Sequence, residues 1–126
     1  MYIDSSFYNK LSQLHNVKFD WQTNNCGMFV GKMLQFMYGK DFLSEYVGKC
    51  LDEKTSWKLI YQKGGWHNIL VNAGFTKRTD NAIYVGDVVI SDNNAIGIYD
   101  GSKGLFAGGA FRDRNKITSV YYYTEK

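Results

Sequence analysis

The chain has 126 residues, a length that suits one compact domain, and we expect residues 1–126 to form a single domain. With 44% hydrophobic and 21% charged residues, it has the composition of an ordinary globular protein. Its formal net charge of +3 is spread in mixed-sign groups, which indicates a solvated surface and no nucleic-acid partner. No apolar run approaches the roughly 18 residues of a membrane span, and the first residues show no secretory signal pattern, so we expect synthesis in a cytoplasm.

Helical periodicity dominates the first 75 residues. We expect one helix to begin after Asp4 or Ser5 and a second to extend from Asn25 to Gly39, because asparagine caps helix N-termini and glycine readily ends helices. Three shorter helices should follow: one capped by Asp41 and reaching Val47, one capped by Thr55 or Ser56 and ended by Gly64-Gly65, and one from Trp66 to Ala73.

The pattern then changes to short runs of β-branched and aromatic residues separated by turn-forming residues. These runs predict strands at residues 83–90, 95–99, 105–111 and 117–124. Because the helices come first and the strands last, the order predicts an α+β fold. We expect the N-terminal helices to pack on a small C-terminal antiparallel sheet.

Cys26 is the first candidate for chemistry, because it lies at the start of the second expected helix. Unpaired N–H groups and the helix dipole at that position favour thiolate, although a small buried hydrophobic residue is an equally simple role for a free cysteine. A nucleophilic cysteine also needs a base. His67 is a candidate catalytic partner or an exposed capping imidazole, whereas His15 should interact with the end of the first helix.

Other polar residues carry weaker signals. Asp87 could orient a base, or its carboxylate could accept N–H groups in the turn before a strand, and the second role is favoured. Cys26 and Cys50 could form a disulfide, although cytoplasmic synthesis favours free thiols. The close ligand spacings of zinc sites are missing from the sequence, so we expect neither a metal nor another cofactor.

Aromatic residues make up 17% of the chain, and a small domain cannot bury all of them. Exposed tryptophan and tyrosine favour protein interfaces, so Trp21, Tyr121 and Tyr123 are candidate binding residues. In a terminal strand, Tyr121 and Tyr123 should share one face and Tyr122 should lie on the other. One of these faces could meet a partner, or both could cover the sheet.

Several motifs appear in a characteristic order. They are Phe19-Asp20-Trp21, the cysteine at the helix start, Tyr38-Gly39-Lys40-Asp41, Gly64-Gly65, Gly86-Asp87-Val88-Val89 and Ile96-Gly97-Ile98-Tyr99. This order resembles the NlpC-like cell-wall peptidases, a compact branch of the papain-like cysteine peptidases. It is most similar to a phage-encoded group found among tail-assembly genes. The similarity extends from about Phe19 to Phe111.

The resemblance implies roles for several positions. Cys26 matches the nucleophile, but Ala95 stands where active members carry the catalytic histidine. Residues 105–108 offer no second polar residue to orient a base, and Asn25 replaces the aspartate common before the cysteine. The resemblance therefore implies a retained fold with a degenerate peptidase site, that is, a pseudoenzyme.

Three functions follow as hypotheses. The first is a structural or assembly protein of the phage tail, located in the virion, whose partners are the tail hub or neighbouring tail proteins. The second is an active cysteine peptidase that hydrolyses peptidoglycan cross-bridges during phage entry, with Cys26 as nucleophile and an unconventional base. The third is a small cytoplasmic binding module unrelated to phages.

Overall fold

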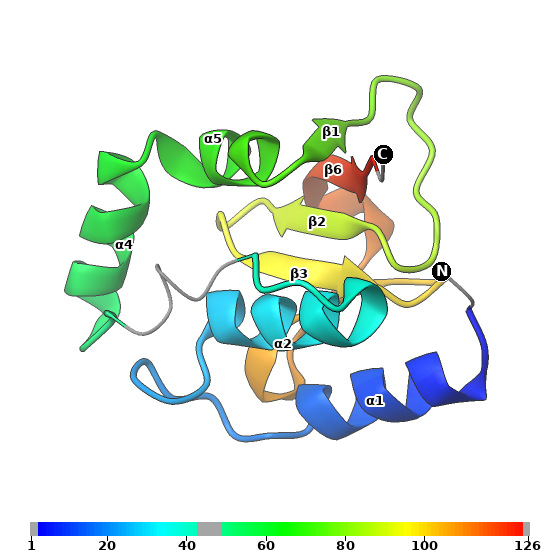
Figure 1. Ribbon diagram of the computed structural model, residues 1–126, viewed down its shortest axis with the longest axis horizontal. Coiled ribbons are helices and arrows are strands. Elements are labelled where there is room, and N and C mark those ends of the chain that lie inside the picture. The colour runs from blue at the N-terminus through cyan, green and yellow to red at the C-terminus, as the bar shows by residue number, and fades with distance from the viewer. Residues whose placement is uncertain (1–2, 43–48, 125–126) are drawn as a thin grey trace.

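The protein is described here by a computed structural model covering residues 3–42 and 49–124, and these residues form an α+β fold (Figure 1). The helices of these ranges are α1 (Ser5–His15), α2 (Cys26–Tyr38), α4 (Glu53–Gln62) and α5 (Gly65–Asn72). The strands are β1 (Phe75–Lys77), β2 (Val88–Ser91), β3 (Ile96–Tyr99), β4 (Gly104–Leu105), β5 (Phe111–Arg112) and β6 (Ile117–Tyr123). Two short 3₁₀ helices, η1 (Ala107–Gly109) and η2 (Arg114–Lys116), flank β5.

The ends of α1 and α2 confirm the predicted capping. The carboxylate of Asp4 accepts hydrogen bonds from the N–H groups of Ser6 and Phe7, so α1 begins at Ser5. Asn25 caps α2, and Gly39 ends it in the left-handed conformation with a φ of +67°. Most of the helix predicted from Asp41 to Val47 lies outside the described residues.

The start of α4 differs from the prediction. Asp52, not Thr55 or Ser56, is the N-cap, and its carboxylate accepts the N–H of Thr55 at 2.8 Å. The Thr55 hydroxyl in turn accepts the N–H of Asp52 at 3.0 Å, which completes a capping box. Thr55 is therefore the reciprocal partner three residues into the helix, and the helix begins at Glu53.

The six strands form one antiparallel sheet in the order β1-β6-β2-β3-β4-β5. The β2–β3 hairpin and β6 confirm three of the predicted strands. The predicted strand at 105–111 is wrong: β4 and β5 are separated by η1, because Gly108 and Gly109 both adopt a φ of +79°. Strand β1 was not predicted, and its three residues pair with the end of β6.

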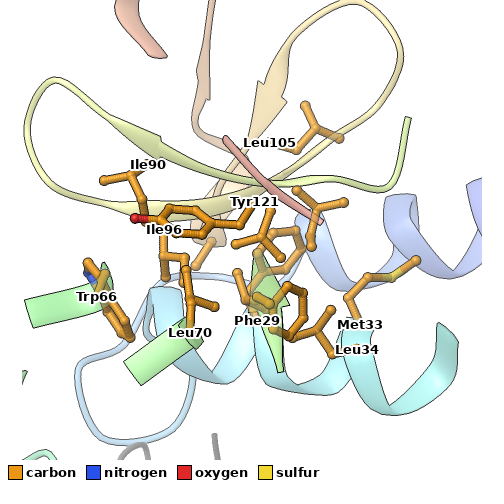
Figure 2. Packing of buried hydrophobic residues seen from close by; sticks show 14 of the residues in the cluster. Phe29, Met33, Leu34, Trp66, Leu70, Ile90, Ile96, Leu105 and Tyr121 are labelled. Atoms are coloured by element: carbon orange, nitrogen blue, oxygen red, sulfur yellow. The ribbon is translucent and has the colours of Figure 1, made fainter. Parts of the chain in front are cut away.

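The main core lies between the helices and one face of the sheet (Figure 2). The buried residues of α2 that point toward the sheet are Phe29, Val30, Met33 and Leu34. They meet Ile96 and Tyr121 from the sheet, and Leu70 closes the cluster from α5. Alternation along the strands sends Val89 and Tyr99 to the opposite face, where they form a smaller cluster with Phe106.

Gly97 sets the close approach of β3 to the segment that follows β4. A Cβ atom at this position would lie 2.3 Å from the Leu105 carbonyl oxygen and 2.7 Å from the Phe106 ring. Only glycine therefore lets Leu105 of β4 and the following Phe106 pack directly on β3. This contact brings residues 106 and 107 beside the start of β3.

A buried ion pair anchors the outer face of the sheet. Asp87, 6% exposed, accepts two hydrogen bonds from Arg78, with Nε to Oδ2 at 2.7 Å and Nη2 to Oδ1 at 3.0 Å. It also accepts the N–H of Tyr84 at 2.9 Å. The Arg78 guanidinium lies 4.6 Å from the ring centre of Tyr84 and 4.5 Å from that of Tyr122. The predicted structural role of Asp87 in its turn is confirmed.

Candidate functional site

The loop before Cys26 is fixed by its own polar residues. Asp20 and Asn24 exchange two backbone hydrogen bonds, at 2.8 and 3.1 Å. The buried side-chain amide of Asn24 donates to the carbonyl oxygens of Val17 and Lys18 at 3.0 and 3.1 Å. The entry to α2 is thus a closed turn, which holds the first residue of the helix in place.

Asn25 joins this turn to the helix. Its Oδ1 accepts the N–H of Met28 at 2.9 Å, and its Nδ2 donates to the carbonyl of Trp21 at 3.0 Å. Asn25 is 4% exposed, so water cannot readily replace either bond. Both the position of Cys26 and that of the Trp21 backbone depend on this side chain.

We expect Asn25→Ala to lower the free energy of unfolding by about 1–2 kcal/mol, because it removes a helix cap and leaves the Trp21 carbonyl without its donor. Urea unfolding followed by circular dichroism measures the change. Asn25→Ser is the matched control, since its hydroxyl keeps an acceptor for the Met28 N–H without burying a charge, and it should lose less stability. Equal losses in the two variants would show that the cap contributes nothing.

Ala95 is held opposite Cys26 by the β2–β3 turn. The N–H of Ser91 donates to the Ala95 carbonyl at 2.9 Å, and the Ala95 N–H donates to the Ser91 hydroxyl at 3.2 Å. The indole N–H of buried Trp66 donates to the carbonyl of Asn94 at 3.1 Å. Helix α5 therefore fixes the tip of the hairpin through one hydrogen bond.

Cys26 and Ala95 together line three adjoining hollows. Two are open, with volumes of about 380 and 510 Å³, and the third is an apolar crevice of about 40 Å³. The first open hollow extends past Phe19 toward Arg112, and the second extends toward Trp57 and Glu53. Cys26 lies at the junction, where a bound chain could pass from one open hollow to the other.

Burial raises the pKa of the Cys26 thiol above its ordinary value. The backbone N–H groups of Ile96 and Ala107 lie close enough to lower this pKa, but by less than burial raises it. Desolvation therefore outweighs the helix-terminus effect that predicted a thiolate. The group facing the open hollows is a neutral thiol at neutral pH.

Neither imidazole is brought to this thiol. The His67 Nδ1 is hydrogen-bonded to the Tyr121 hydroxyl at 2.7 Å, and the His15 Nε2 to the Ala110 carbonyl at 2.8 Å. Among the described residues, no histidine lines any of the three hollows at Cys26. The role of His67 as a catalytic partner stays a prediction without support from this arrangement, because its ring is exposed on α5 and hydrogen-bonded to the Tyr121 hydroxyl.

Aromatic side chains line the hollows at Cys26. Trp21, predicted as a binding residue, lines two of them. Phe19, Trp57 and Tyr61 lie there as well and were not singled out as binding residues from the sequence. Tyr61 is 68% exposed, an unusual state for a large aromatic residue on a helix that also carries core residues. The buried residues of α4 are Ser56 and Ile60, four positions apart on one face of the helix. This helical spacing is the sequence signal that could have placed Tyr61 on the exposed face.

The two predicted binding tyrosines of β6 lie elsewhere. Tyr121 is 2% exposed and belongs to the core, so its interpretation as part of an exposed contact face is wrong. Tyr123 packs at the end of α2, against the rings of Tyr38, Phe42 and Phe75, and its hydroxyl accepts a hydrogen bond from Lys40 at 2.7 Å. The predicted alternation is confirmed, because Tyr122 lies on the opposite face beside Arg78.

Cys26 is a free thiol, and both Cys26 and Cys50 line the apolar crevice. Within residues 3–42 and 49–124, no group of three histidine, cysteine or acidic residues could hold a metal ion. None of the helices in those ranges combines the length and hydropathy needed to cross a membrane.

A family described as "Domain of unknown function (DUF6950)" matches residues 4–121. The chain belongs to this family. A search of curated proteins finds no match. The DUF6950 match includes the helices α1, α2, α4 and α5 and extends into β6, so it contains both Cys26 and Ala95 with the elements that position them.

Proposed function

We propose that this protein is a tail-associated structural or assembly protein of a bacteriophage, built on an NlpC-like fold whose peptidase site is degenerate. The observation that carries the proposal is the pairing of Cys26 with Ala95 at one junction of hollows. The NlpC-like resemblance places a catalytic histidine at residue 95. The methyl side chain of alanine has no nitrogen that could take a proton from the thiol.

The electrostatic setting supports a role other than hydrolysis. A general base, most often histidine, typically contributes a factor of about a hundred to ten thousand in rate, and among the described residues no histidine lines the hollows at Cys26. Burial also raises the pKa of the thiol, which lowers the fraction of nucleophilic thiolate. What the site retains is a rigid, aromatic-lined surface suited to binding.

In this proposal the two open hollows at Cys26 form one groove, which binds a segment of a neighbouring tail protein without cleaving it. The aromatic rings of Trp21, Trp57 and Tyr61 offer large contact areas with little side-chain entropy to lose. The partner class, the tail hub or its neighbours, comes from the resemblance. Peptidoglycan is the alternative ligand, and an active peptidase is the alternative function.

The test compares phage particles that carry the wild-type protein, Cys26→Ala or Trp57→Ala. We expect Cys26→Ala to be incorporated into purified particles and to leave infectivity unchanged, because the thiol takes part in no chemistry. Trp57→Ala should reduce incorporation, since it removes a groove wall. Release of peptide fragments from cell wall by the wild-type protein but not by Cys26→Ala would establish the peptidase instead. Absence of the wild-type protein from particles would refute the tail role.

A further inference from the structure

A separate hollow lies beside β6. Its volume of about 590 Å³ falls in the range of small-molecule sites, roughly 300–1,000 Å³. Residues 77–79 and 81–83, from the end of β1 and the loop after it, line it together with residues 114–115 and 117–120, from η2 and β6. The loop swings away from the sheet before it returns to β2 (Figure 1). The hollow shares no lining residue with those at Cys26, so it is a distinct candidate for a ligand.

Part of the lining is apolar and held in place by the core. Ile83, Ile117 and Val120 contribute to it, and all three are half-buried. Each of them also packs against the smaller core cluster around Val89, on the face of the sheet opposite the main core. The hollow therefore offers a fixed apolar surface, on which an apolar or flat group of a ligand could be buried.

The charged side chains of the hollow are all basic. Lys77, Arg78 and Arg114 line it, and none of its described lining residues is acidic. Asp87 neutralises Arg78, but in the described parts of the chain neither Lys77 nor Arg114 forms an ion pair. Asp80, in the same loop, is exposed and lies outside the lining. The hollow is therefore positively charged and favours an anion.

These polar side chains keep hydrogen-bond donors for a ligand. Arg114 donates through Nη2 to the Asn81 carbonyl, which orients its guanidinium and leaves the other N–H groups of that side chain for an anion. Within the described ranges, the side chains of Lys77, Thr79 and Ser119 line the hollow without a hydrogen bond to another residue. A carboxylate offers two oxygens to such donors, whereas a phosphate monoester offers three. The number of donors therefore favours a phosphate.

We propose that this hollow binds a small phosphate monoester with a flat, largely apolar body, of the class of a nucleoside monophosphate. Lys77 and Arg114 bind the phosphate, and the apolar surface of Ile83, Ile117 and Val120 contacts the base. Inorganic phosphate would satisfy the first feature only, and an uncharged nucleoside the second only. The mixed-sign charges elsewhere on the chain offer no continuous basic track to a nucleic acid, so the ligand is a free nucleotide. The proposal does not depend on the role of Cys26.

The test titrates adenosine monophosphate into the isotope-labelled protein and follows the amide shifts. We expect saturable shifts, the largest of them at residues 77–83 and 114–120. Inorganic phosphate and adenosine should each bind at least about tenfold more weakly, because each lacks one of the two recognised features. The proposal would be overturned by the absence of saturable shifts at millimolar nucleotide, or by equal binding of phosphate or adenosine. Tighter binding of a 5′-phosphorylated oligonucleotide would overturn it as well, in favour of a nucleic-acid end.

Two protein variants complete the experiment. Arg114→Glu should weaken binding of adenosine monophosphate about tenfold, since it replaces attraction of the phosphate by repulsion, and should leave the weak binding of adenosine unchanged. Lys58→Glu, an identical change of charge at an exposed position of α4, is the matched control and should bind the nucleotide as the wild type does. Nucleotide binding that is unaffected by Arg114→Glu, or equally weakened by Lys58→Glu, would show that the basic side chains of the hollow do not recognise the phosphate.

Discussion

Ala95→His should make Cys26 react faster with an alkylating reagent at pH 7 than the wild-type thiol does. Ala95 and Cys26 line the same three hollows, so an imidazole at residue 95 would extend into the space beside the sulfur. A neighbouring imidazolium stabilises the thiolate and lowers the thiol pKa toward about 7 or below. In the wild-type protein the neutral thiol is favoured, because burial raises the pKa of Cys26.

The expected increase can be estimated. An ordinary thiol, with a pKa of about 8.5, is about 3% ionised at pH 7 and the buried Cys26 thiol is ionised less, whereas a thiol with a pKa near 7 is about half ionised. Part of this gain is lost because thiolates of lower pKa are weaker nucleophiles, which leaves a net increase of roughly tenfold. Alkylation is measured in a Cys50→Ala background, so that only one thiol reacts.

Ala95→Gln is the control for this prediction. Glutamine adds polar bulk at the same position but cannot titrate near neutral pH, so it should leave the rate close to that of the wild type. If Ala95→His reacted no faster than Ala95→Gln, residue 95 would not be within reach of the sulfur. The assignment of Ala95 to the position of the missing base would then fail.

The second large effect concerns stability. We expect Asp87→Ala to lower the free energy of unfolding by about 3 kcal/mol, because it leaves a partly buried guanidinium without its counter-charge. The Arg78 side chain is 18% exposed, and both of its hydrogen bonds to Asp87 are lost. The Tyr84 N–H also loses its acceptor. Denaturant unfolding of the variant and the wild type gives the difference.

A second ion pair on the same molecule provides the comparison. Arg112 and Asp92 are 4.0 Å apart and 40% and 47% exposed, so Asp92→Ala should cost at most about 0.5 kcal/mol. In the double variant Arg78→Met/Asp87→Ala, the loss should be smaller than the sum of the two single losses, because no unpaired charge remains. A loss for Asp87→Ala as small as that for Asp92→Ala would contradict the structural role assigned to the pair.

The local signals in the sequence were sufficient to predict the ends of several elements. Asp4, Asn25 and Gly39 act through short-range backbone geometry, and the structure confirms each of them. The β2–β3 hairpin was predictable for the same reason, since its apolar runs and turn residues are contiguous. The helices-then-strands order was enough to give the α+β class.

Contacts between distant segments were not predictable in this way. Strand β1 has only three residues and exists because β6, more than 40 positions later, pairs with it. The same pairing brings Arg78 to Asp87, so the partner of that carboxylate could not be derived from the motif around Asp87. The burial of Tyr121 follows from its place on the inner face of a central strand, not from its residue type.

The candidate site also combines features that the local sequence predicts with features that depend on distant contacts. The place of Cys26 at a helix start follows from the local pattern, whereas its proximity to Ala95 was expected only from the family resemblance. The pKa direction of the thiol depends on its burial in the folded protein, which no local pattern contains. His67 was a reasonable candidate by residue type, but its ring is bonded to Tyr121.

The central claim is that no imidazole of the described residues activates the Cys26 thiol, and the rate of Cys26 alkylation as a function of pH tests this directly. In the Cys50→Ala background, we predict a slower rate than that of glutathione at pH 7 and an inflection displaced above the ordinary cysteine pKa, because burial disfavours the thiolate. A rate above that of glutathione at pH 7, with an inflection below the ordinary value, would contradict the account and restore Cys26 as an activated nucleophile.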